Sequence, residues 1–142
     1  MSDAKKPMPA ISTFEASVHG VWLNDTRLTA VTIGSSLWCD LVAGEHNTGG
    51  ALFGVYQVST NEEVHSSQWE RHPFSDELVG IVSGAMTLFL DDTTGFNSIK
   101  LTSLTAVIIP AGVWHRFEVT DPTLMFSLAR RNGTELREVH NG

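Results

Sequence analysis

Two imidazoles and two carboxylates between residues 70 and 115 are the side chains of this sequence best suited to chemistry. His72, Glu77 and His115 can each offer a nitrogen or oxygen atom to a divalent metal ion, and Glu70 can add a second carboxylate. Two imidazoles and one carboxylate are a ligand set used by non-haem iron enzymes, and the extra negative charge favours Mn²⁺ or Fe²⁺, with Zn²⁺ and Ni²⁺ still compatible. The sequence therefore predicts a polar, metal-binding pocket, with Glu70 as a fourth ligand or as a catalytic general base.

Glu70 and His72 lie two residues apart, which places them on one face of a β-strand. Ser66 and Gln68 share that face, whereas Trp69 points the other way. A face made only of polar side chains either meets solvent or lines a wet cavity. In the second case, the carboxylate of Glu70 and the imidazole of His72 converge on one point inside a barrel.

Glu77 and His115 approach the same region from other strands. Glu77 begins the return strand of a hairpin, and an inward-pointing Glu77 brings Val79 and Ile81 inward with it. His115 follows a Pro-Ala-Gly turn at residues 110–112, in which proline fixes φ and glycine tolerates a positive φ. A turn at this point aims the imidazole of His115 at the pocket from a different strand.

Short strands account for most of the sequence. Runs rich in Val, Ile, Leu, Phe, Trp and Thr alternate with clusters of Gly, Asn, Asp, Ser and Pro, and few windows show helical periodicity. This spacing is typical of an all-β sandwich or barrel. We expect a flexible N-terminal arm at residues 1–12 and a single β-barrel domain at residues 13–142. The predicted strands are 27–33, 37–42, 51–58, 67–72, 77–82, 86–90, 98–101, 106–109, 114–119 and 124–129.

The pattern around the four candidate residues resembles the cupin superfamily. The stretch from Glu70 to Gly84 is similar to the first cupin motif, G-x5-H-x-H-x3,4-E-x6-G, and residues 110–115 are similar to the second, G-x5-P-x-G-x2-H-x3-N. The resemblance implies a single-domain jelly-roll β-barrel. It also implies a homodimer and an activity among the dioxygenases, isomerases, epimerases, decarboxylases and lyases of that family. In the family, the residues matched by His72, Glu77 and His115 hold a divalent metal ion.

The sequence departs from both motifs at several positions. Glu70 stands where the first motif has its first histidine, Val64 and Leu104 replace the opening glycines, and Val119 replaces the final asparagine. The change at Glu70 is compatible with ligation through its carboxylate, with a salt bridge to a nearby arginine, or with loss of the metal. Gly80 falls where relatives carry a bulky residue, which predicts a wider pocket nearby.

Two functions fit these residues. The first is a metal-dependent enzyme acting on a small oxygenated organic molecule, and the second is a non-catalytic small-molecule-binding or sensing protein with a metal-free pocket. Mainly apolar walls favour a ligand with a hydrophobic body and one chelating polar end. The predicted pocket walls are Phe53, Val55, Val79, Ile81, Phe117 and Phe126.

The composition limits the classes of partner and the cellular compartment that we expect for the protein. The 142 residues carry a formal net charge of −7 with scattered bases, so we expect no nucleic-acid partner. No apolar run approaches the ~20 residues that a membrane helix needs, and no secretory signal follows the first residues. Because Cys39 is the lone cysteine, a reducing compartment fits the sequence, and we expect a cytoplasmic protein with no membrane partner.

Overall fold

The computed structural model describes residues 15–18, 20–22, 29–31, 33–34, 50–92 and 95–140, with side chains from Ile33 onward except that of Asp92. All regular structure in these ranges is strand, which confirms the all-β prediction. The predicted arm at residues 1–12 and Cys39 lie outside the described residues. The described part of the chain holds no helix with the length and apolar character required to cross a lipid bilayer. The strands are β1 (Glu15–Val18), β2 (Gly20–Trp22), β3 (Thr29–Val31), β4 (Ala51–Val58), β5 (Gln68–Arg71), β6 (Glu77–Asp92), β7 (Gly95–Thr102), β8 (Thr105–Ile109), β9 (Trp114–Arg130) and β10 (Glu135–Glu138).

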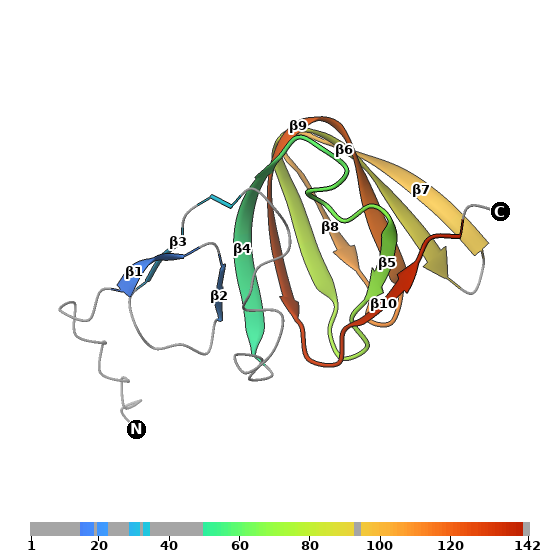
Figure 1. Cartoon of the computed structure of the whole chain (residues 1–142), viewed down its shortest axis with the longest axis horizontal. Coiled ribbons are helices and arrows are strands. Elements are labelled where there is room, and N and C mark those ends of the chain that lie inside the picture. The colour runs from blue at the N-terminus through green and yellow to red at the C-terminus, as the bar shows by residue number, and fades with distance from the viewer. Residues whose placement is uncertain are drawn as a thin grey trace, which may run out of the picture.

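Two long antiparallel strands, β6 and β9, fold the eight-stranded sheet into two layers (Figure 1). In one layer, the first half of β9 lies next to β5 and then β10, and the second half of β6 lies next to β7. In the other layer, the second half of β9 lies next to β4 and then β2, and the first half of β6 lies next to β8. Strands that pass from one layer to the other in this way wrap a β-sandwich around a common core.

The corner between the layers lies at Gly84 in β6 and at residues 121–122 in β9. Register shifts mark this stretch of the β6–β9 pairing, and Gly84 has a φ of 99°. The extra residues change the phase of the strand: Val79 and Ile81 are buried before the corner, and the even-numbered Met86 is buried after it. The bulge therefore lets one strand contribute core side chains to both layers.

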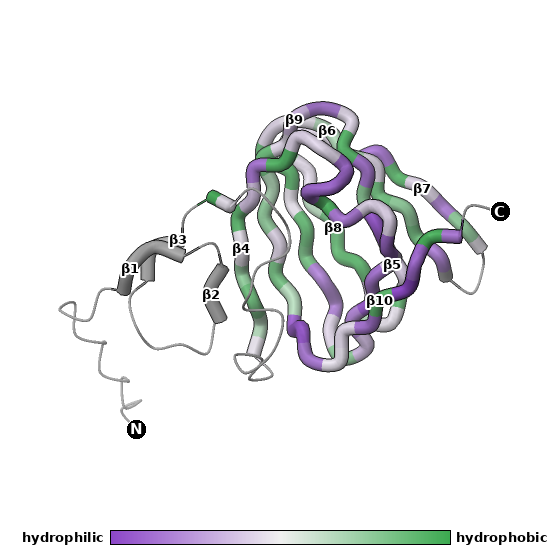
Figure 2. The backbone as a smooth tube through the Cα atoms, viewed as in Figure 1, coloured by the Kyte–Doolittle hydropathy of each residue, from purple (hydrophilic) through white to green (hydrophobic). Residues whose placement is uncertain are grey.

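The core lies between the two layers. Its buried side chains come from β4, β6, β7, β8 and β9 and from Val64 in the segment before β5. Burial of each large aliphatic side chain contributes about 1.5–3 kcal/mol. Figure 2 shows the contrast between hydrophobic residues along β6 and hydrophilic residues along β5 and β10. The largest fully buried apolar side chains are Leu52, Tyr56, Val58, Val79, Ile81, Met86, Leu88 and Met125.

Candidate metal centre

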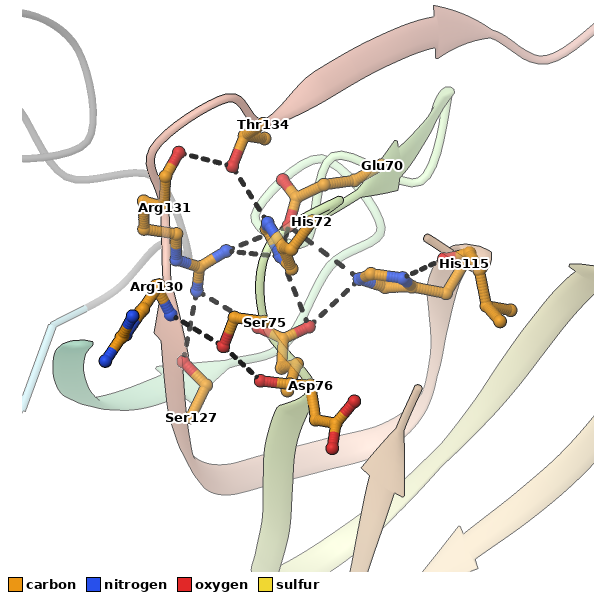
Figure 3. Close-up of polar contacts among 11 residues, drawn as sticks. Glu70, His72, Ser75, Asp76, His115, Ser127, Arg130, Arg131 and Thr134 are labelled. Carbon is orange, nitrogen blue, oxygen red and sulfur yellow. Dashed lines mark hydrogen bonds and ion pairs between the residues drawn. The ribbon is translucent and has the colours of Figure 1, made fainter. Parts of the chain in front are cut away.

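The side chains of Glu70, His72 and His115 point toward one another (Figure 3), and Glu77 completes a group of four. Glu70 belongs to β5, His72 follows that strand directly, Glu77 is the first residue of β6, and His115 is the second residue of β9. Glu70 and His115 are Cα partners in the β5–β9 pairing. One nitrogen or oxygen atom from each of the four residues lies within 4.8 Å of the others. The structure thus brings together all four residues that the sequence predicted for the site.

Backbone contacts between two turns fix the approach of these strands. The amide of Gly112 donates to the carbonyl oxygen of His72 at 3.0 Å, and the amide of Ala111 donates to Oδ1 of Asp76 at 2.9 Å. The Pro-Ala-Gly turn before His115 is therefore attached to the turn between β5 and β6. This attachment joins the two motif segments at the end of the molecule where the four side chains meet.

Histidine nitrogens and glutamate oxygens alternate around the centre of the site. Glu70 Oε1 lies 2.8 Å from His72 Nε2 and 3.8 Å from His115 Nε2. Glu77 Oε1 lies 2.9 Å from His115 Nε2 and 3.6 Å from His72 Nε2. The Glu77 side chain is 4% exposed, whereas that of Glu70 is 25% exposed. Glu70 is therefore the group on the open side of the site.

A threonine on the far side of His72 orients its ring. Nδ1 of His72 lies 2.8 Å from Oγ1 of Thr134. The Thr134 hydroxyl donates its hydrogen to the carbonyl oxygen of Arg131 at 2.7 Å. Because a hydroxyl has only one hydrogen to donate, the Thr134 oxygen accepts from His72 Nδ1–H. The other nitrogen, Nε2, faces the centre.

His115 is held in the same way by the backbone. Its Nδ1 lies 3.0 Å from the carbonyl oxygen of Val113, an acceptor only, so Nδ1 carries a proton and donates it. Metal-ligating histidines use this arrangement, in which one ring nitrogen donates to a carbonyl or hydroxyl and the other binds the ion. Both histidines therefore present Nε2 to the same point.

Arg131 is a fifth charged residue in the site, and the sequence analysis did not identify it. Its Nη1 lies 2.9 Å from Glu70 Oε1 and 3.0 Å from His72 Nε2, and its Nη2 lies 3.1 Å from Glu77 Oε2. The salt bridge between Glu70 and a nearby arginine, one of the three alternatives for Glu70, is thus present. The guanidinium pairs with both carboxylates and offsets one of their two negative charges.

The charges and hydrogen bonds shift the pKa values of all four groups. Burial alone would raise the pKa of Glu77, but the charge of Arg131 and the hydrogen bonds from the two histidines lower it overall. Burial also acts to raise the pKa of Glu70, and the same histidines and arginine hold it well below its usual range. Burial would lower the pKa of His115, but its hydrogen bonds to the two glutamates raise it to about 10. The pKa of His72 is raised by the same two carboxylates against the opposing effect of burial.

The donor set fits a divalent metal ion. Ligand atoms that each lie about 2.1 Å from one ion are separated by roughly 3.0–3.4 Å at octahedral or tetrahedral angles. The four nitrogen–oxygen separations, 2.8, 2.9, 3.6 and 3.8 Å, bracket this range. Since the raised pKa of His115 keeps a proton on its Nε2 at neutral pH, a metal ion has to displace that proton to bind.

A cavity of about 40 Å³ opens beside Glu70, Glu77 and His115. Of the predicted walls, Val79 and Phe117 line it, while Ile81 is buried in the core. Phe53, Val55 and Phe126 do not, and Phe53 instead packs against Phe126 at 6.3 Å between ring centroids. The prediction for these three was wrong because it placed the opposite set of alternating side chains inside. In β4 and β9 it is Leu52 and Met125 that point inward. The remaining apolar walls are Val64, Met125 and Leu136, and the polar lining includes His65, Gln68 and Ser127.

Gly80 does not widen this cavity. A Cβ atom at Gly80 would lie 2.1 Å from Cζ of Phe126, so the phenyl ring already occupies the space that a side chain would fill. Gly80 also alternates with Val79, which faces the cavity. The predicted widening was therefore wrong.

Extending the predicted last strand by two residues would have identified Arg131 as a residue of the interior. The predicted strand ended at residue 129, but Thr123, Met125, Ser127 and Ala129 are all buried. The same alternation, extended by two residues, places residue 131 in the interior. Thr134 carries no comparable signal, because its role depends on the turn that brings it to His72.

The positions of the two motif segments decide the fold. They lie on a two-layered antiparallel β-structure, and His72, Glu77 and His115 meet between the layers, as the resemblance implied. The chain has a cupin-type fold. Glu77 and His115, near the starts of β6 and β9, line the cavity, and His72 directly follows the end of β5.

Comparisons with known proteins give likenesses among solved structures. No protein-family model and no curated protein matches the sequence. The chain is similar to BH2720 from Bacillus halodurans, with 19% identity, a TM-score of 0.47 and coverage of 56% of this chain and 61% of that one. It is similar to iron(II) HppE, with 15% identity, a TM-score of 0.46 and coverage of 56% of this chain and 42% of that one. It is also similar to a cupin-2 domain-containing protein from Shewanella frigidimarina, with 16% identity and a TM-score of 0.47. That likeness covers 68% of this chain and 82% of the other. The chain thus spans less than two thirds of the length of the first two.

Proposed function

We propose that this pocket binds a divalent metal ion and that the protein is a metal-dependent enzyme acting on a small oxygenated organic molecule. The observation that carries the proposal is the convergence of two oriented Nε2 atoms with a buried carboxylate, Glu77. His72, Glu77 and His115 would hold the ion. Its oxygen-rich surroundings favour Mn²⁺ or Fe²⁺, with Zn²⁺ and Ni²⁺ as weaker candidates.

A bound ion would supply Lewis-acid polarisation of a substrate oxygen, or a water activated at neutral pH. The chain's own groups would position the substrate and move its protons. Glu70 is the carboxylate on the open side, so it is the group that can serve as fourth ligand or accept a proton from a substrate in the cavity. The apolar walls would hold the carbon part of the substrate and exclude water.

A second function is favoured by a specific observation. Nη1 of Arg131 contacts both Glu70 Oε1 and His72 Nε2, so a cation of the chain itself already contacts two of the converging atoms without a metal. A binding or sensing protein with this metal-free pocket would respond to organic ligands and ignore chelators.

The cytoplasmic location and the homodimer stay predictions. A mass of one chain, measured by light scattering, would contradict the homodimer.

Thermal unfolding with metals and chelator separates the two functions. An ion that binds only the native state at a hundredfold excess over Kd stabilises it by about 2.7 kcal/mol, which corresponds to roughly 5–10 °C in a chain of this size. We expect this shift with Mn²⁺ or Fe²⁺ under anaerobic conditions, its reversal by chelator, and no shift in His72→Ala. Metal-loaded protein is then incubated with small hydroxy and oxo acids, and conversion is followed by NMR with His115→Ala as control. A chelator-insensitive Tm would favour the metal-free binding protein.

Thr134→Val tests the orientation of His72. The valine keeps the shape of threonine but cannot accept from Nδ1–H, so the imidazole loses the partner that fixes its tautomer. We expect metal affinity to fall about 10–100-fold, measured by titration calorimetry. Thr134→Ser, which retains the hydroxyl, should bind metal as the wild type does. Equal affinity in the valine variant would show that the ring is held by other contacts.

A further inference from the structure

The two terminal nitrogens of the Arg131 guanidinium, Nη1 and Nη2, contact different atoms of the proposed metal site. The inference drawn from these contacts rests on that proposed site. The Nη2 arm contacts Glu77 Oε2, which is not the oxygen that faces the two histidines. The Nη1 arm contacts Glu70 Oε1 and His72 Nε2, which are two of the converging atoms themselves. A metal ion therefore leaves the first arm in place and competes directly with the second.

Arg131 compensates one of the two carboxylate charges of the site before a metal arrives. With neutral imidazoles, Glu70, Glu77 and Arg131 sum to one negative charge, and a divalent ion changes this sum to one positive charge. Arg131 is 7% exposed, and an uncompensated charge in such surroundings is costly. One monoanion beside the ion and the guanidinium restores neutrality.

The space next to these groups fits a small anion. The cavity of about 40 Å³ is lined by Arg131, Ser127 and the Glu70 carboxylate on its polar side. At roughly 10–15 Å³ for each enclosed water, it has room for about three or four waters, a space that a carboxylate group can enter. A carboxylate group has three non-hydrogen atoms, and one of its oxygens can accept a charge-assisted hydrogen bond from Nη1. The apolar walls, among them Val79 and Phe117, would contact the carbon atoms that carry the carboxylate.

We propose that Arg131 is a cation shared between two states of the site: it pairs with Glu70 and Glu77 without a metal, and its Nη1 arm binds the carboxylate of a small monocarboxylic acid when a metal ion is present. Metal ion and carboxylate therefore bind cooperatively. The guanidinium also lowers the affinity for the ion alone, because the ion has to displace Nη1 from Glu70 and His72. The substrate class of the proposed enzyme is accordingly a short carboxylic acid with a second oxygen for the metal.

The experiment is a calorimetric titration of Mn²⁺, at matched free metal concentrations, with and without glycolate. Glycolamide, the neutral amide of the same size, is the control ligand. In the wild type we expect glycolate to increase the affinity for Mn²⁺ by at least about fivefold, within the range usual for coupled sites, and glycolamide to leave it unchanged. Arg131→Gln should bind Mn²⁺ alone more tightly than the wild type and show no gain with glycolate.

Two further variants keep the test decisive. Arg130→Gln removes the neighbouring arginine, which is exposed and points away from the two histidines (Figure 3), and should behave as the wild type. Arg131→Lys keeps the charge but lacks the second arm, so it should keep the wild-type affinity for Mn²⁺ and lose the glycolate gain, even if Arg131→Gln fails to fold. A glycolate gain that persists in Arg131→Gln or Arg131→Lys would overturn this inference and leave the metal site intact. Failure of all four proteins to bind Mn²⁺ would overturn the metal site as well.

Discussion

Glu77→Gln is expected to lower the free energy of unfolding of the metal-free protein by about 3–5 kcal/mol, the usual cost of removing one partner from a buried charge network. The Glu77 carboxylate contacts Arg131 through one oxygen and the two histidines through the other. Glutamine keeps the shape but loses the charge, and its amide hydrogens face the guanidinium. Arg131 and His115 are then left with one carboxylate between them. Urea denaturation in the presence of chelator measures the change.

The matched control is Glu135→Gln. Glu135 accepts a hydrogen bond from Arg71 at 2.7 Å, and its side chain is 47% exposed. Exposed ion pairs contribute only about 0–1 kcal/mol, so we expect this variant to lose less than about 1 kcal/mol. Glu77→Gln should also abolish metal binding, whereas Glu135→Gln should retain it. Equal losses of stability in the two variants would show that the buried network is not a source of stability.

Gly84→Ala is expected to destabilise the fold by about 3 kcal/mol, because strain and a clash act together. A φ of 99° lies in the region that side chains rarely adopt, which costs about 1–2 kcal/mol. An added Cβ would lie 2.2 Å from the carbonyl oxygen of Pro122 and 2.7 Å from Cα of Thr123. Backbone atoms of β9 have to move to make room, and such overpacking costs a further 1–3 kcal/mol or so. The effect appears in thermal and urea unfolding.

Gly112→Ala separates strain from clash. Gly112 also has a positive φ, of 79°, but nothing lies within 4 Å of an added Cβ. We expect it to lose only about 1–2 kcal/mol, from the conformational cost alone. If the alanine variants at 84 and 112 lost the same amount, the corner between the layers would be more adaptable than the contacts with Pro122 indicate.

The sequence predicted strands correctly where apolar and polar side chains alternate regularly. It did not predict that two of the strands continue through a β-bulge. The predicted strand 51–58 coincides with β4 (Ala51–Val58). The predicted pairs 77–82 with 86–90, and 114–119 with 124–129, are single strands in the structure, β6 and β9. Gly84 and the Asp-Pro at 121–122 resemble turn signals, yet they form a bulged corner that bends a continuous strand. Local composition cannot distinguish the two, because the difference depends on pairing with the neighbouring strand.

The candidate site was predictable to the extent that its residues stand on regular strands. Glu70, His72, Glu77 and His115 were all identified, and the structure brings them within 4.8 Å. Arg131 was missed because the last strand was ended too early, and Thr134 because its contact depends on a turn. The strand β10, whose four residues are all exposed, was missed because it has no apolar alternation to mark it.

The central claim is that His72, Glu77 and His115 hold a divalent metal ion, and metal content tests it most directly. Tag-free wild type, His72→Ala and His115→Ala are compared by mass spectrometry after purification and after anaerobic reconstitution with Fe²⁺, Mn²⁺, Zn²⁺ and Ni²⁺. Circular dichroism first establishes that the variants are folded. We predict near-stoichiometric metal in the wild type and none in either variant. A wild type that stays metal-free after reconstitution, or variants that retain the metal, would contradict the claim.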